Sequence, residues 1–135
     1  MNETLAPVTL ANATPEQFDA AFDTWLEGSQ QIIDQHWKAN GYTFALAPVL
    51  KAHHGTRFIR IERCDRNLEG VVSDRGSAYA FIDMTGGSIG GVNHARGSVL
   101  KPASWKVPAK HARGNIFDAT NGLSRMDFHG PAYLR

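Results

Sequence analysis

The chain has 135 residues, of which 42% are hydrophobic and 20% are charged, and these proportions predict one folded domain and exclude a wholly disordered chain. No run of about 18 apolar residues occurs, so no membrane-spanning helix is expected. The single cysteine, Cys64, excludes a disulfide scaffold and is typical of a reduced thiol in the cytosol. The first residues lack the basic start and apolar core of a signal peptide, so we expect the protein to stay in the compartment where it is made.

The net charge of +1 conceals an uneven distribution along the chain. Residues 1–40 hold six acids and one base, whereas the remainder carries 13 bases and 7 acids. An acidic start and a basic body indicate either an anionic partner or a homo-oligomer formed through opposite faces. The alternative is an ordinary spread of solubilising charge, because charge alone identifies no ligand.

A helix is predicted over residues 14–40. Thr14 can cap its start, Pro15 suits the first helical position, and Gln17 completes the spacing of a capping box. Gly41 supplies a residue suited to the left-handed conformation after the helix. Gly28 could kink or split the helix near its middle. The apolar residues at helical spacing are Phe18, Phe22, Trp25, Leu26, Ile32, Ile33 and Trp37.

The remainder of the chain reads as an antiparallel sheet of four or five strands with an irregular C-terminal tail. Strands are expected at residues 42–47, 57–63, 70–73, 77–83 and 98–101. Residues 85–97 include five glycines in 13 positions and are predicted to form an irregular loop. The expected fold class is therefore α+β, with a polar lead-in at 1–13 and a single domain at 14–135 in which the amphipathic helix packs on the sheet.

The most informative segment is a basic loop over residues 101–115. It contains four permanent positive charges, one histidine, one tryptophan and no acid, and two prolines favour an extended backbone. Lysine and arginine can neutralise phosphates, and an exposed tryptophan can stack on an unpaired base. Trp105 could instead fill the core, with the charges around it. The candidate nucleic-acid-binding residues are Lys101, Trp105, Lys106, Lys110, His111 and Arg113.

Other chemistry has weaker support in the sequence. The glycine pairs at 86–87 and 90–91 lack the Walker spacing, and no helix follows them as a Rossmann fingerprint requires. The six histidines show no metal-ligand spacing, and neither Ser104 nor Cys64 lies in a nucleophile motif. We therefore predict no catalytic residue, no metal site and no cofactor, although residues distant in sequence can still meet in a pocket.

One motif resembles a known group of proteins. The aromatic strand 79–83 is followed by Ser98–Lys101 and then by the run Ser-Trp-Lys-Val-Pro-Ala-Lys-His-Ala-Arg-Gly-Asn-Ile at 104–116, and residues 130–135 read Gly-Pro-Ala-Tyr-Leu-Arg. Over residues 56–135 this pattern resembles small uncharacterised proteins of tailed bacteriophages. Their usual tight turn is expanded here by about ten glycine-rich residues around 88–96, and the long N-terminal helix also goes beyond the short members of the group. The resemblance implies a phage origin and a compact β-rich domain, and it names no reaction.

These observations lead to one functional hypothesis and two alternatives. The first is a non-enzymatic phage protein that contacts nucleic acid through the basic loop, largely without sequence preference. The alternatives are a virion or assembly component, and an inhibitor of a host enzyme or defence protein that acts through its surface. The expected location is the cytoplasm of the infected bacterium or the virion, with no membrane association.

Overall fold

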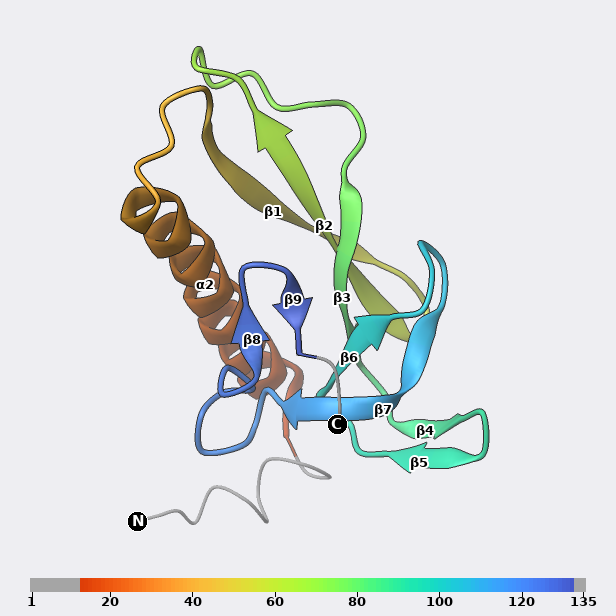
Figure 1. Ribbon diagram of the computed structural model, residues 1–135. Helices are drawn as coiled ribbons and strands as arrows, with labels where there is room; N and C mark the ends of the chain where they lie inside the picture. Colours follow the sequence, from red (N-terminus) through yellow and green to blue (C-terminus); the bar gives the residue numbers. More distant parts are fainter. Residues whose placement is uncertain (1–12, 133–135) are drawn as a thin grey trace.

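The computed structural model describes residues 13–132. The predicted lead-in lies outside the described residues except for Ala13, which is buried. In this range one helix, α2, packs on a five-stranded antiparallel sheet, and two small hairpins complete the fold (Figure 1). The predicted α+β fold is confirmed.

Helix α2 spans Pro15–Ala39 and begins as its sequence predicts. The Thr14 hydroxyl accepts a hydrogen bond from the Gln17 amide at 3.1 Å, and the Gln17 side chain accepts one from the Thr14 amide at 2.8 Å. This reciprocal pair satisfies two amides that would otherwise lack a partner at the helix start. Asn40 caps the other end, and Gly41 follows with φ +64°.

The glycine in the middle of α2 allows close packing and does not split the helix. The helix continues through Gly28, where an added Cβ would lie 2.5 Å from Cδ1 of Leu123. Leu123 precedes the C-terminal hairpin of β8 (Met126–Asp127) and β9 (Gly130–Pro131). The Tyr79 hydroxyl donates a 2.8 Å hydrogen bond to the Asp127 carbonyl, which fastens this hairpin to the sheet.

The sheet has the order β1-β2-β3-β6-β7, and every neighbouring pair is antiparallel. Its strands are β1 (Leu46–His54), β2 (Phe58–Arg66), β3 (Ser77–Asp83), β6 (Ser98–Pro102) and β7 (Pro108–Asn115). Between β3 and β6 the chain forms a separate hairpin of β4 (Gly87–Ile89) and β5 (Val92–His94).

Three details of the sequence reading are wrong. The strand predicted at 42–47 is misplaced: residues 42–45 form no strand, and β1 begins at Leu46 and continues through Pro48. Pro48 is tolerated because β1 is an edge strand with a bulge between Leu46 and Val49, where a missing amide costs little. Residues 70–73 form no strand and contribute only an isolated bridge from Val72 to Arg66. The glycine-rich loop contains the β4–β5 hairpin, with its two turn glycines at positive φ.

Two cross-strand rows define the two faces of the sheet. One row, toward α2, is His54, Ile59, Ile82 and Val99, and the other is His53, Arg60, Phe81, Leu100 and Ala112. Neighbouring positions in a strand point to opposite faces, so the second row lies away from the helix. We call this side the helix-free face. Figure 1 shows α2 and the β8–β9 hairpin on the other side of the sheet.

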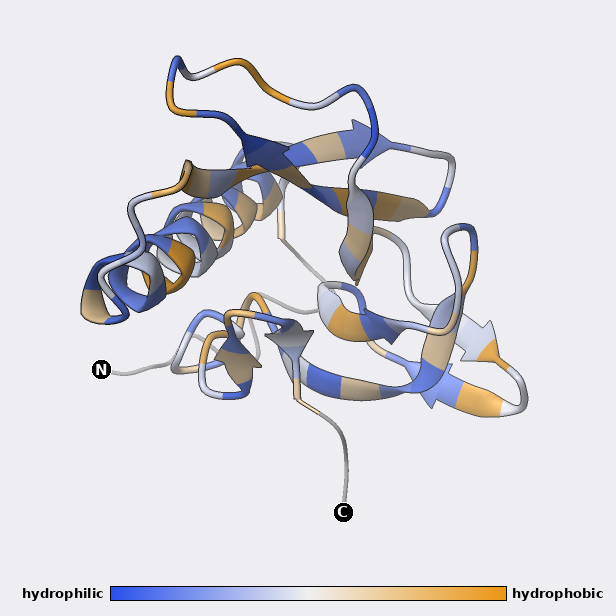
Figure 2. Ribbon diagram, turned by 45° about the horizontal axis from the view of Figure 1, so that its top comes forward, coloured by the Kyte–Doolittle hydropathy of each residue, from blue (hydrophilic) through white to orange (hydrophobic). Residues whose placement is uncertain are grey.

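The main core lies between α2 and the sheet. Polar and apolar residues alternate along α2, β1 and β2, as Figure 2 shows by colour, and the apolar ones fill this layer. Gln30 also ties the helix to the sheet edge, because its side chain accepts from the Leu50 amide at 2.9 Å and donates to the Pro48 carbonyl at 2.8 Å. The fully buried apolar residues of this core are Trp25, Ile33, Ile59, Ile61, Ala80, Ile82, Val99 and Ile116.

Candidate functional site

The predicted basic loop is a β-hairpin, formed by β6, a turn at residues 103–107, and β7. The amides of Ala103 and Ser104 both donate to the Val107 carbonyl, at 2.9 and 3.0 Å. The turn folds back over the helix-free face, because Trp105 reaches past β3 to Arg60 on β2. The guanidinium carbon of Arg60 lies 4.3 Å from the centroid of the Trp105 ring.

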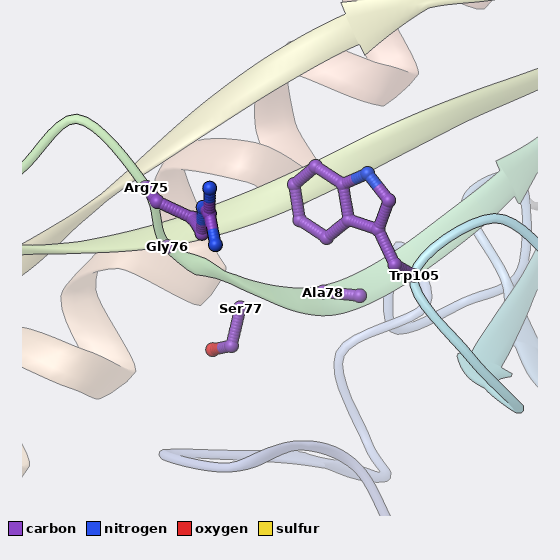
Figure 3. Close-up of a pocket in the computed structure, with 5 residues that line it drawn as sticks. All are labelled: Arg75, Gly76, Ser77, Ala78 and Trp105. Carbon is purple, nitrogen blue, oxygen red and sulfur yellow. The ribbon is translucent and has the colours of Figure 1, made fainter.

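Trp105 is not part of the core. Its side chain is 38% exposed, so the interpretation of Trp105 as a core plug is wrong. The indole borders a hollow of about 610 Å³ that Arg75, Gly76, Ser77 and Ala78 also line. Figure 3 shows the indole and the Arg75 side chain on the same side of β3, facing each other across this hollow. An aromatic surface and a cation therefore border one open recess.

A second hollow, of about 250 Å³, adjoins Arg60 of the Arg60–Trp105 pair. Arg60, Lys106, His53 and Phe81 line it, together with the β1–β2 turn. Trp105 lines only the first hollow and Arg60 only the second. The stacked pair thus borders two recesses on the helix-free face.

A buried carboxylate, that of Glu62 on β2, connects neighbouring segments of this face. Glu62 is 7% exposed; its carboxylate accepts from the Gly76 amide at 2.7 Å and bonds the His53 ring at 2.8 Å. The bond from His53, followed by the bond from Gly76, holds the pKa of Glu62 below its ordinary range. Gly76 must be glycine here, because an added Cβ would lie 2.2 Å from the Arg63 carbonyl oxygen.

An ion pair between Arg57 and Asp83 fixes the end of β3. Arg57 donates to both oxygens of the fully buried Asp83, at 3.2 and 2.9 Å, and also to the Ser88 carbonyl at 3.0 Å. The hydrogen bonds that Arg57 donates to Asp83 raise the pKa of Arg57, although burial works against this. This pair anchors the β4–β5 hairpin to the sheet. The positive charge of Arg57 and the negative charge of Asp83 offset each other, so the pair adds little to the net charge of the helix-free face.

The six residues predicted from the basic loop do not form one surface. Lys101 donates to the Pro131 carbonyl at 3.0 Å, and Arg113, which is 8% exposed, donates to the Ala132 carbonyl at 3.1 Å. Both side chains thus hold the C-terminal segment. Lys106 is exposed and lines the second hollow beside Arg60.

The other two predicted residues lie on β7. Lys110 and His111 are both exposed. The Lys110 side chain passes the β4–β5 turn, where an added Cβ on Gly90 would lie 3.4 Å from its Cδ. The Lys110 carbonyl also bonds the His94 ring at 2.7 Å. Of the predicted set, only Trp105 and Lys106 border the two hollows.

The sequence reading missed Arg60, Arg75 and Phe81 as members of this site. Alternation in residues 57–63 already places Arg60 on the face opposite Ile59 and Ile61. No local pattern shows that a turn some 45 residues later returns to cover it. Within residues 13–132, no group of three potential metal ligands occurs, and no helix is long and apolar enough to cross a membrane.

The fold and this site define a small α+β protein whose open sheet face carries a stacked Arg–Trp pair that borders two recesses. The chain belongs to a family of unknown function, DUF7717, whose model matches residues 24–134. Searches of curated proteins and of solved structures found no match to this chain. The family match covers the sheet, both recesses and most of α2.

Proposed function

We propose that this chain is a phage-encoded protein that binds single-stranded nucleic acid on its helix-free face, without a catalytic step. The observation that carries the proposal is the 38% exposed indole of Trp105, which a cation–π contact with Arg60 holds over the sheet. Tryptophan faces stack on unpaired bases of any sequence, and neighbouring cations bind phosphates. Lys106 and Arg75 are exposed beside this indole.

Single strands fit this face better than duplex. In a duplex the base faces are already stacked on one another, so a protein indole gains little contact with them. The recess bordered by Trp105 and Arg75 lies on a sheet, and bases of a flexible strand can be turned into it. We therefore expect DNA and RNA single strands to bind with little sequence preference and strong salt dependence.

The test is a fluorescence-anisotropy titration with labelled single-stranded DNA, single-stranded RNA and duplex DNA, each at low and moderate salt. The double variant Lys106→Ala/Lys110→Ala is expected to weaken single-strand binding. The matched control, Lys38→Ala/Arg125→Ala, removes two exposed cations outside the site and is expected to leave it unchanged. Absence of binding at low salt, or equal binding by the first variant and the wild type, contradicts the proposal.

The phage origin rests on the motif at residues 104–116, which resembles that of small tailed-phage proteins. In this structure the motif forms the Trp105 turn and β7, so the residues that carry the resemblance include part of the proposed interface. The corresponding place of action is the cytoplasm of the infected bacterium, where replicating and transcribed phage nucleic acid is present.

A second candidate function is a virion or assembly component, and an exposed aromatic cluster favours it. Phe44 is 71% and Tyr42 39% exposed, and their rings contact each other and Trp37 at centroid distances of 4.6–5.6 Å. Exposed apolar patches often mark protein contacts. Mass spectrometry of purified particles tests this candidate through a stoichiometric copy number. If this chain is instead recovered from host lysate together with a specific host protein, the inhibitor alternative is favoured.

A further inference from the structure

Among the described residues, Arg60 differs from the other partly buried arginines in its hydrogen bonding. Its Nε atom is buried and has no hydrogen-bond partner among the described residues. By contrast, Arg57, Arg63, Arg66, Arg96 and Arg113 each donate to a carbonyl or a carboxylate. A buried donor without an acceptor is costly, and in a native protein it calls for a ligand or another explanation.

Neither of the two buried carboxylates near the site is paired with Arg60. Both oxygens of Glu62 are engaged, one by His53 and the other by the Gly76 amide. Asp83 is paired with Arg57 through both of its oxygens. Neither carboxylate pairs with Arg60 in the structure, so we consider an anion from outside the described residues as its partner. The hollow that Arg60 lines also receives Lys106, so it already contains a second cation for such an anion.

The position of Trp105 identifies the kind of anion. Arg60 faces the smaller hollow, and the indole stacked 4.3 Å from its guanidinium borders the larger one. A ligand that uses both must carry an anionic group and a flat ring. Guanidinium groups bind phosphate through two parallel hydrogen bonds, and tryptophan stacks on bases. A nucleotide has both parts.

We propose that the Arg60–Trp105 pair is a one-nucleotide binding site. The phosphate binds Arg60 and Lys106 in the smaller hollow, and the attached base stacks beside Trp105 in the larger one. The inference rests on the nucleic-acid interface proposed above and refines it, since it fixes which group of the strand lies in which recess. It also explains why Nε of Arg60 is buried without an acceptor among the described residues.

The test uses uridine 5′-monophosphate, uridine and inorganic phosphate as separate ligands in isothermal titration calorimetry. In parallel, ¹H–¹⁵N NMR follows the indole N–H of Trp105, assigned with Trp105→Phe. The mononucleotide is expected to bind at least tenfold more tightly than either fragment and to shift the indole signal. Equal affinity for phosphate and the mononucleotide overturns the nucleotide assignment, as does an indole signal that does not move.

Two variants separate this site from a structural role of Arg60. Arg60→Met is expected to abolish the preference for the mononucleotide over uridine, and Arg60→Lys to restore part of it. The melting temperature of Arg60→Met should stay within a few degrees of the wild type, because Nε of Arg60 has no acceptor among the described residues and its stacking partner, Trp105, lies outside the core. A large loss of stability with an unchanged ligand preference contradicts the proposal. Oligonucleotide binding is measured separately by anisotropy. If oligonucleotides bind but the mononucleotide test fails, the one-nucleotide site is wrong and the wider nucleic-acid interface still stands.

Discussion

The guanidinium of Arg60 on β2 stacks on the indole of Trp105 in the β6–β7 turn, with 4.3 Å between the guanidinium carbon and the ring centroid. The two residues are 45 positions apart in sequence, and β3 lies between their strands in the sheet. Their contact keeps the turn folded over the helix-free face. It also leaves the indole more than a third exposed, whereas Phe81 and Leu100, in the cross-strand row of Arg60, are buried.

Replacement of Trp105 should weaken single-strand binding without unfolding the protein. Loss of one stacked base contact costs about 1–3 kcal/mol, so Trp105→Ala is expected to raise the Kd roughly 5- to 150-fold. The melting temperature should change little, because the side chain is outside the core. The measurement is anisotropy with a labelled oligonucleotide. Phe44→Ala is the control, since it removes an exposed aromatic elsewhere; an equal loss in both variants would show that the effect is not local to the site.

The salt dependence of binding should distinguish Lys106 from Lys101. If Lys106 neutralises one phosphate of a single strand, Lys106→Ala lowers the magnitude of the slope of log Kobs against log salt by about 0.7. Lys101 donates to the Pro131 carbonyl on the other side of the sheet, so Lys101→Met should leave the slope as it is. Titrations at four salt concentrations give both slopes. A reduced slope for Lys101→Met alone would mean that the strand follows the opposite face.

Arg113 is expected to act on stability rather than binding. It is buried and donates to the Ala132 carbonyl, so Arg113→Met leaves that acceptor without its partner. The expected loss is about 1–3 kcal/mol of the free energy of unfolding, measured by urea denaturation. Lys110→Met, an exposed position on the same strand, is the control. Weaker binding by a fully folded Arg113→Met would contradict this assignment.

The stability of the fold should depend on pH through Glu62. Its pKa in the folded protein lies below the ordinary value of 4.5, so its carboxylate stabilises the fold at higher pH. That contribution is lost as the pH falls through the folded-state pKa. Glu62→Gln should therefore be less stable than the wild type at pH 7, and the difference should narrow below about pH 4.5. Melting by circular dichroism at several pH values measures this, with the exposed Glu69→Gln as control. A constant difference across the range would refute it.

Cys64 should be unreactive in the folded protein. The thiol is fully buried, and burial, followed by the charge of Glu62, raises its pKa. Burial keeps a reagent from reaching the thiol, and the raised pKa lowers the fraction present as thiolate, which is the reactive form. We expect no modification by a thiol-specific reagent under native conditions and one equivalent in denaturant. Rapid native modification would indicate that the sheet opens around β2.

The sequence predicts the parts of this fold whose signals are local. The capping box at Thr14 and the alternation around Ile59 and Ile61 specify the helix and the second sheet strand, and both are confirmed. Strand β7 lacks such a signal, because as an edge strand it exposes Lys110, His111 and Ala112 in succession. Its residues therefore read as a loop.

The candidate site was predicted only in part, because it too depends on features without a local signal in the sequence. Trp105 and Lys106 are evident from composition, whereas the roles of Lys101 and Arg113 depend on where the C-terminal hairpin packs. The partnership of Arg60 with Trp105 depends on strand order and on a turn that folds back over the sheet. Neither property is encoded in a short stretch of sequence.

The most direct test of the central claim is an NMR titration of the ¹⁵N-labelled protein with an unlabelled single-stranded oligonucleotide at low salt. The account predicts that the perturbed signals belong to the helix-free face, with Trp105, Lys106 and Arg60 shifted most and the exposed side of α2 unaffected. Perturbations confined to α2, or none at all at saturating oligonucleotide, would contradict it.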